Sequence, residues 1–185
     1  MNRIKRLIEK YNVHIALPWE DVAAPQRVIF CVYKEDDELQ LRAKIDEFEI
    51  VTKQAGHEWA VFDLTDTFAV WLANQRYKKS YFKNPEFLSA LLPQYLEFIK
   101  KEFDCFLKAH KINRNTVVAL KGVGSLFGFL KVKEVVNALA PAFEGRLLVF
   151  FPGTYDEHNN YRLFNAYDGW NYLAFPITAD KDLYS

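Results

Sequence analysis

Four mostly apolar runs have the length and composition of buried strands. They occupy residues 27–33, 58–64, 116–121 and 146–151. Runs that are apolar at nearly every position are typical of parallel strands covered on both faces. Between them, apolar side chains recur at helical spacing, so strands and helices alternate along the chain. This order predicts parallel strands joined by right-handed crossover connections.

Apolar stripes and proline positions predict the helices. Residues 3–12 and 41–52 each place apolar side chains on one helical face. A long helix is expected after the Asn84-Pro85 pair, and Pro93 should kink it or divide it in two. A further helix should follow a glycine-containing turn and end at Pro141.

Two aromatic runs finish the chain, NYRLFNAY at 160–167 and WNYLAFPI at 170–177. The Asp168-Gly169 pair between them is typical of a hairpin turn. We therefore expect an α/β fold with a mainly parallel sheet of four to five strands, flanked by helices, and a C-terminal hairpin that extends one edge. A single domain is expected over residues 1–185, consisting of an N-terminal helix and connector (1–25), a core (26–153) and an aromatic C-terminal segment (154–185).

Composition excludes several classes of protein. Half of the residues are hydrophobic and 16% are aromatic, which fits a packed core and not a disordered chain. No apolar stretch reaches the length of a membrane helix and the N-terminal residues lack a signal-peptide pattern, so we expect a cytoplasmic protein without membrane contact. Cys31 and Cys105 lie in apolar runs and are expected to be buried free thiols.

Charge is balanced overall but uneven locally. The 24 basic and 24 acidic residues cancel, so no global field attracts nucleic acid, and no direct nucleic-acid contact is expected. Residues 35–38 are all acidic, whereas residues 76–83 hold four cations and no acid. Such runs are either solvated surface or docking patches for a partner.

The glycine-containing turn at residues 122–128 (GVGSLFG) is the strongest candidate for ligand binding. It joins a strand to a helix, where phosphate-binding loops occur. A P-loop needs a Gly-Lys-Ser/Thr triplet, and a dinucleotide fingerprint needs a glycine where Phe127 stands. Three roles for this turn therefore remain open: a purely structural connection, an anion-binding site, or a contact with a partner protein. The candidate loop residues are Lys121, Gly122, Gly124, Ser125, Phe127, Pro152, Gly153 and Tyr155.

The chain shows no complete catalytic or metal-binding set. Its two cysteines and four histidines lack paired spacing, so no metal or cofactor is expected. Nucleophilic hydrolysis is not expected, because no G-x-S-x-G elbow is present. Ser125 stands at a predicted helix start and is expected to cap that helix. The carboxylates Asp63 and Asp66, and Asp156 and Glu157, should cap helices or solvate loops, with a metal-assisted enzyme as the alternative. No enzymatic activity is expected.

The aromatic C-terminal segment is the candidate partner surface. Its rings cannot all point inward on an edge hairpin, because successive residues face opposite sides. Aromatic residues are enriched in interface cores, whereas nucleic-acid stacking needs interleaved Lys and Arg, of which residues 154–185 have only two. The predicted partner surface consists of Tyr161, Phe164, Tyr167, Trp170 and Tyr172.

One long stretch carries family motifs. Residues 122–156 hold Gly-Val-Gly, then Leu-Phe, an apolar helix with Asn137 and Leu139, and a strand ending Phe-Phe-Pro-Gly-x-Tyr. This block resembles the signature of the BrxB domain family of bacteriophage exclusion (BREX) systems. The runs RVIFCVY, VFDLTD and YRLF are similar to other strands of that family, so the resemblance covers roughly residues 27–165.

The resemblance implies a non-catalytic accessory or scaffolding subunit of an anti-phage complex, acting through protein–protein contacts. BREX systems include a phosphatase-like PglZ protein, an ATPase and an adenine methyltransferase. The PglZ protein is the first expected partner, the ATPase or the methyltransferase are alternatives, and a homodimer is also open. The family has no established catalytic residues to carry over. The alternative, suggested by the glycine turn, is a nucleotide- or phosphate-sensing regulatory domain.

Overall fold

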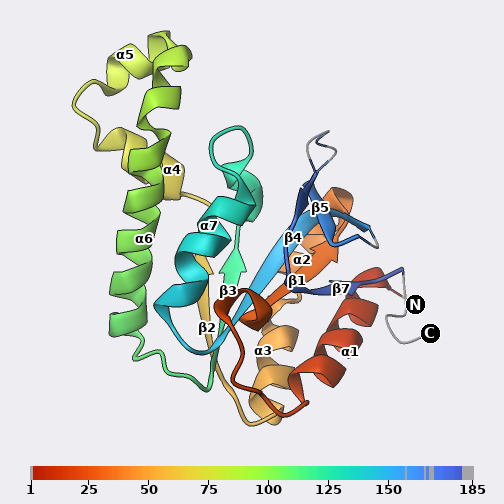
Figure 1. The fold of residues 1–185 in the computed structure, drawn as a ribbon. Coiled ribbons are helices and arrows are strands. Elements are labelled where there is room, and N and C mark those ends of the chain that lie inside the picture. Colours follow the sequence, from red (N-terminus) through yellow and green to blue (C-terminus); the bar gives the residue numbers. More distant parts are fainter. Residues whose placement is uncertain (1, 157, 165, 167–168, 181–185) are drawn as a thin grey trace.

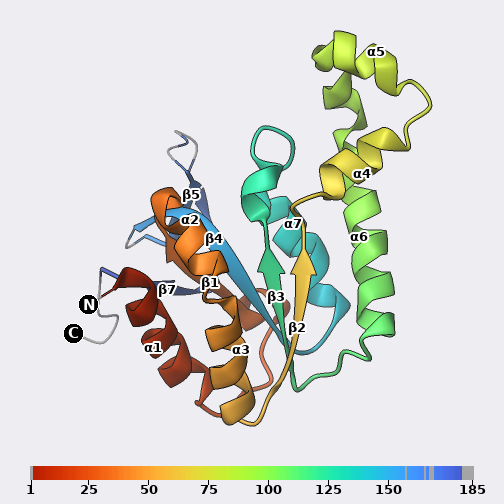
Figure 2. The ribbon, with the colours of Figure 1, turned by 180° about the vertical axis from the view of Figure 1, so that it is seen from behind.

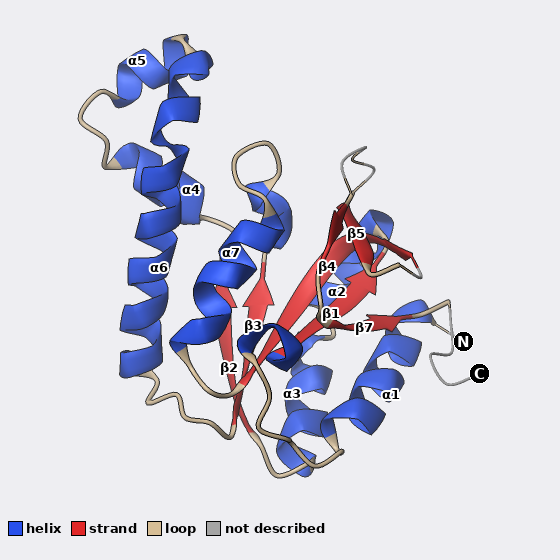
Figure 3. Cartoon of the chain, viewed as in Figure 1, coloured by secondary structure: helices blue, strands red, loops and turns tan. Residues whose placement is uncertain are grey.

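In the computed structural model, helices cover both faces of a mixed seven-stranded sheet (Figure 1; Figure 3). The structure describes residues 2–156, 158–164, 166 and 169–180. Five strands lie side by side, each parallel to its neighbour, in the order β2 (Glu58–Asp63), β3 (Thr116–Lys121), β4 (Arg146–Asp156), β1 (Val28–Tyr33) and β7 (Phe175–Thr178). β5 (Asn160–Leu163) pairs antiparallel with the end of β4, and β6 (Trp170–Asn171) pairs antiparallel with β5. The α/β class is confirmed.

The central strands bury both of their faces. Every residue of β1 is buried, and β3 is buried up to Lys121. Alternate residues supply two cores: Ile29 and Cys31 face one layer of helices, whereas Phe30 and Val32 face the other. A strand between two helical layers needs apolar residues at both sets of positions, which explains the unbroken apolar runs.

β4 continues past its predicted end at residue 151. Pro152 and Gly153 were expected to close it, but the strand runs on to Asp156 because β5 pairs with its last residues. The Pro152 carbonyl oxygen accepts a hydrogen bond from the Phe164 N–H at 2.9 Å. A Cβ at Gly153 would lie 2.0 Å from the Arg162 carbonyl oxygen, so glycine permits the close pairing.

The C-terminal runs differ from the predicted hairpin, and the sheet has seven strands instead of four to five. Only the start of the second run pairs with the first, with Tyr161 opposite Trp170. The chain then reaches the free edge of β1 and adds β7 there as a parallel strand. Pro176 suits this edge, because proline has no N–H to donate to a further strand. Asp168 lies outside the described residues.

One helical layer packs on Ile29 and Cys31 and consists of α1 (Arg3–Ile15), α2 (Glu38–Arg42) and α3 (Ile45–Gln54). The other contains α4 (Thr67–Ala73), α6 (Leu92–Ala109) and α7 (Val132–Leu139) (Figure 1; Figure 2). As predicted, Pro93 divides the long helix: the 3₁₀ helix η3 (Pro85–Leu91) precedes α6, whose first turn contains the proline. The remaining short 3₁₀ helices are η1 (Ala24–Arg27), η2 (Glu35–Asp37), η4 (Val123–Leu126) and η5 (Ala140–Ala142).

A helical arm projects beyond the carboxyl ends of the strands (Figure 1; Figure 2). We define it as residues 75–91, which include α5 (Lys78–Lys83) and η3. Neither of these two helices contains a buried residue. Among the described residues, no helix combines the length and the apolar character needed to cross a membrane.

Candidate functional site

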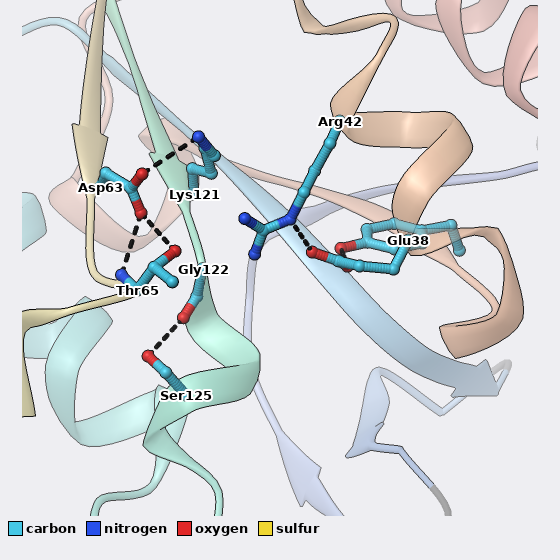
Figure 4. Close-up of polar contacts among 8 residues, drawn as sticks. Glu38, Arg42, Asp63, Thr65, Lys121, Gly122 and Ser125 are labelled. Atoms are coloured by element: carbon cyan, nitrogen blue, oxygen red, sulfur yellow. Dashed lines mark hydrogen bonds and ion pairs between the residues drawn. The ribbon is translucent and has the colours of Figure 1, made fainter.

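The ends of β2 and β3 are joined by an ion pair. Asp63 Oδ2 lies 3.0 Å from Lys121 Nζ, and Asp63 Oδ1 accepts hydrogen bonds from the Thr65 N–H (2.9 Å) and the Thr65 hydroxyl (2.5 Å) (Figure 4). Burial acts to raise the pKa of Asp63, but the hydrogen bonds from Thr65 and the charge of Lys121 outweigh it and lower the pKa. The ionised carboxylate therefore fastens two neighbouring strand ends.

The glycine turn packs closely against the segment that follows β2. Gly122 has a left-handed φ of 79°, and a Cβ there would lie 2.4 Å from Thr65 Oγ1. The Ser125 hydroxyl lies within hydrogen-bonding distance of the carbonyl oxygens of Gly122 (2.7 Å) and Leu64 (3.1 Å). Ser125 thus lies inside η4 and ties the turn to the neighbouring segment, so its predicted role as a helix cap is wrong.

A second polar cluster lies at the end of β1. Glu38 accepts a hydrogen bond from Arg42 Nε at 2.6 Å and another from the Tyr33 hydroxyl. Figure 4 shows the Arg42 guanidinium reaching toward the Asp63–Lys121 pair. The two clusters together contain two cations, and each is paired with a carboxylate. The sequence signal that could have identified Glu38 and Arg42 is their i,i+4 spacing on a helix.

The other candidate acids have structural roles or none. Asp156 accepts hydrogen bonds from the His158 N–H (3.0 Å) and the Asn160 side chain (3.0 Å), which shape the β4–β5 turn. Asp66 occupies the N-cap position of α4, as predicted, but its side chain makes no capping hydrogen bond, while Glu157 lies outside the described residues. No group of three or more His, Cys, Asp or Glu suited to a metal ion occurs within the described ranges.

The cysteines differ in exposure. Cys31 is buried as predicted, and burial raises the pKa of its thiol. The prediction that Cys105 is buried is wrong: it is exposed, because it lies on the outer side of α6, two residues from the buried Phe103.

Two residues of the predicted aromatic partner surface belong to the core. Tyr161 is 0% exposed and Tyr172 is 5% exposed, and both pack on Phe30, with ring centroids 4.6 Å and 5.8 Å away. The prediction assumed a flat edge hairpin, whereas β5 and β6 fold onto the face of the sheet that Phe30 presents. Phe164 and Trp170 remain half-buried. Tyr167 lies outside the described residues.

The rest of the candidate loop is dispersed. Pro152 and Gly153 are buried within β4, and the Tyr155 ring packs at a tilt of 46° against the Tyr161 ring, with centroids 4.9 Å apart. A Cβ at Gly124 would lie 2.8 Å from the Phe164 ring. Phe127 is 53% exposed, the most open aromatic side chain of this loop.

An apolar groove of about 680 Å³ lies beside Phe127. Three segments far apart in the sequence form it: the first turns of α6, residues 127–132, and the C-terminal segment. Its lining includes Phe127, which belongs to the candidate loop, and Trp170, which belongs to the candidate partner surface. Sequence reasoning missed Leu96, whose only signal is an apolar position beside the buried stripe of α6. The other lining residues are Leu92, Pro93, Gly128, Phe129, Leu130, Lys131, Val132, Glu134, Leu163 and Ala166.

Comparison with protein families identifies the chain. A family model described as "BREX protein BrxB" matches residues 69–177, more than half of the 185 residues. The match begins after β2, ends within β7, and includes the helical arm, the glycine turn and every residue that lines the groove. Comparison with curated proteins finds no match, and comparison with solved structures finds none either. As the motifs of residues 122–156 predict, the chain belongs to the BrxB family of the BREX phage-defence systems.

Proposed function

We propose that this BREX defence protein is a non-catalytic subunit that holds another component of the complex through the groove beside Phe127. The observation that carries the proposal is an apolar concavity with an exposed aromatic side chain at its border. Apolar concavities with few polar groups accept apolar side chains, and aromatic residues are enriched at the centres of protein interfaces. Family membership supplies the context of a defence-system subunit.

The polar groups that chemistry would need are engaged in holding the fold, which supports a non-catalytic role. Asp63 is bonded to Lys121 and Thr65, and the Ser125 hydroxyl lies against two backbone carbonyls. Burial raises the pKa of the Cys31 thiol, which opposes formation of a reactive thiolate. Catalysis in such a complex would then belong to other polypeptides.

The size of the groove fits an inserted side chain. Its volume of about 680 Å³ is sufficient for one or two bulky residues of a partner. Burying a large apolar side chain contributes about 1.5–3 kcal/mol. An anchor of that strength, surrounded by contacts that exclude water, is typical of a binding hot spot.

The test is a binding measurement with the other proteins of the same BREX system, beginning with the phosphatase-like PglZ protein. Phe127→Glu places a charge beside the apolar groove and should weaken binding by at least about tenfold, because burying an unpaired carboxylate is costly. Leu39→Glu is the matched control, since Leu39 is 81% exposed and lies on α2, which packs on the other face of the sheet. Equal affinities for the Phe127→Glu variant and the parent, or no binding by any of these proteins, would contradict the proposal.

A further inference from the structure

The helical arm (residues 75–91) has few packing contacts within the chain. α5 and η3 contain no buried residue, and only half-buried side chains such as Tyr81, Leu88 and Leu91 rest on the core. Helices of six or seven residues are marginal in water unless tertiary packing stabilises them. A partner that covers the arm would supply the packing that the chain itself does not.

Exposed rings mark the outer surface of the arm. Tyr77 is 59% exposed, Phe82 is 68% exposed and Phe87 is 54% exposed. Large apolar side chains scattered singly on a surface need no explanation, but three within eleven residues form a concentration. Aromatic anchors of this kind dominate the energetics of protein interfaces.

Four cations lie close to these rings in the sequence and are not paired with acids among the described residues. Arg76, Lys78, Lys79 and Lys83 are all exposed, and none forms an ion pair with a carboxylate in the described part of the chain. The Arg76 guanidinium lies 5.4 Å from the Tyr77 ring centroid, and Lys78 Nζ donates to the Ala73 carbonyl oxygen at 3.0 Å. An apolar patch with a basic rim is complementary to an apolar pocket with an acidic rim.

A second copy of the chain fits this description poorly. Its acidic run at residues 35–38 is followed by the exposed Leu39, but Asp37 Oδ2 lies 3.4 Å from Arg3 Nε and Glu38 Oε1 lies 2.6 Å from Arg42 Nε. Carboxylates already paired within the chain gain less from a new cation. Nucleic acid fits less well than protein, because four cations neutralise few phosphates and the chain has no net charge.

We propose that the helical arm is a docking surface for a protein partner that offers an apolar pocket rimmed by Asp and Glu side chains. This surface is separate from the groove beside Phe127. The inference rests on the proposed function in one respect, which is that the partner is another protein of the same BREX complex.

The experiment compares variants of the full chain for binding to each purified protein of that BREX system. Phe82→Ser removes an apolar anchor, and the double variant Lys79→Glu/Lys83→Glu reverses two charges of the rim. Each should weaken binding by about tenfold or more. Raising the salt concentration should weaken binding of the parent, whereas the charge-reversed variant should lose this dependence. Lys101→Glu/Lys108→Glu is the matched charge control, because both lysines are exposed on the distal part of α6.

The outcomes separate this inference from the proposed function. Since α5 and η3 bury no residue, all arm variants should unfold at the temperature of the parent. If the parent binds a BREX protein and the arm variants bind it equally well, the arm inference is overturned and the proposed function stands. If no BREX protein binds the parent, both are overturned. If the charge reversal affects only self-association, or only binding to a single-stranded oligonucleotide, the arm has a different partner and the inference is wrong.

Discussion

Replacing Gly122 by alanine tests whether the glycine turn serves close packing. The new Cβ would lie 2.4 Å from Thr65 Oγ1 and 2.7 Å from the Thr65 backbone nitrogen, and the residue would keep a φ of 79°. The left-handed conformation costs a side-chain-bearing residue about 1–2 kcal/mol, and overpacking costs about 1–3 kcal/mol. We therefore expect the free energy of unfolding to fall by about 3 kcal/mol and the melting temperature by about 6–12 °C.

Two other glycines separate the conformational cost of the substitution from the cost of overpacking. Gly56 and Gly128 have φ values of 87° and 81°, but a Cβ at either position meets no atom within 4 Å. Gly56→Ala and Gly128→Ala should each cost only about 1–2 kcal/mol, which is the conformational penalty alone. Adding Thr65→Ala to Gly122→Ala should restore part of the stability, because the nearest atom is removed.

Urea denaturation of the four variants measures these differences, with slopes that should match the parent if the unfolded states are alike. If Gly122→Ala destabilises the protein no more than Gly128→Ala does, the close approach to Thr65 is not the reason why glycine is needed at position 122. A turn open enough to accept a Cβ would then be free to bind a phosphate group, which would favour the sensing alternative.

Two further predictions concern polar side chains in the core between the sheet and the helical layer of α1, α2 and α3. His14 stacks on Phe175 at 3.8 Å, and burial, aided by Arg146, lowers its pKa to about 4. Because the unfolded chain binds this proton below about pH 6.5 and the folded chain does not, the free energy of unfolding should fall between pH 6.5 and pH 4 by up to roughly 3 kcal/mol. His14→Phe should flatten that dependence in urea titrations, and an unchanged pH slope would contradict it. Tyr11→Phe removes the buried 2.6 Å hydrogen bond to Thr52 and should cost about 1 kcal/mol at neutral pH; a variant as stable as the parent would show that the bond contributes nothing.

The strands and helices could be predicted where burial leaves a local pattern. β1 and β3 are buried on both faces, so their sequences are apolar without alternation. The division at Pro93 follows from the missing N–H of proline. The extension of β4 could not be predicted in this way, because it depends on pairing with β5, and Pro152-Gly153 has the local character of a turn.

The neighbours of a strand are not encoded locally. β7 pairs with β1 from the opposite end of the chain, and an aromatic run carries no mark of its partner. For the same reason Tyr161 and Tyr172 were predicted to be exposed although they are buried. A flat edge hairpin would have turned alternate side chains toward solvent, whereas β5 and β6 fold onto the sheet. The groove could not be predicted because residues 92–96 and 127–132 meet Leu163, Ala166 and Trp170 only through tertiary packing.

Amide hydrogen exchange of the reconstituted complex tests the central claim most directly. Binding of the partner should slow exchange in residues 92–96 and 127–134, which contain most of the groove's lining, and leave α2 and α3 unchanged. The Phe127→Glu variant should lose that protection. Protection confined to α2 and α3, with the segments around the groove exchanging as they do in the free protein, would contradict the account.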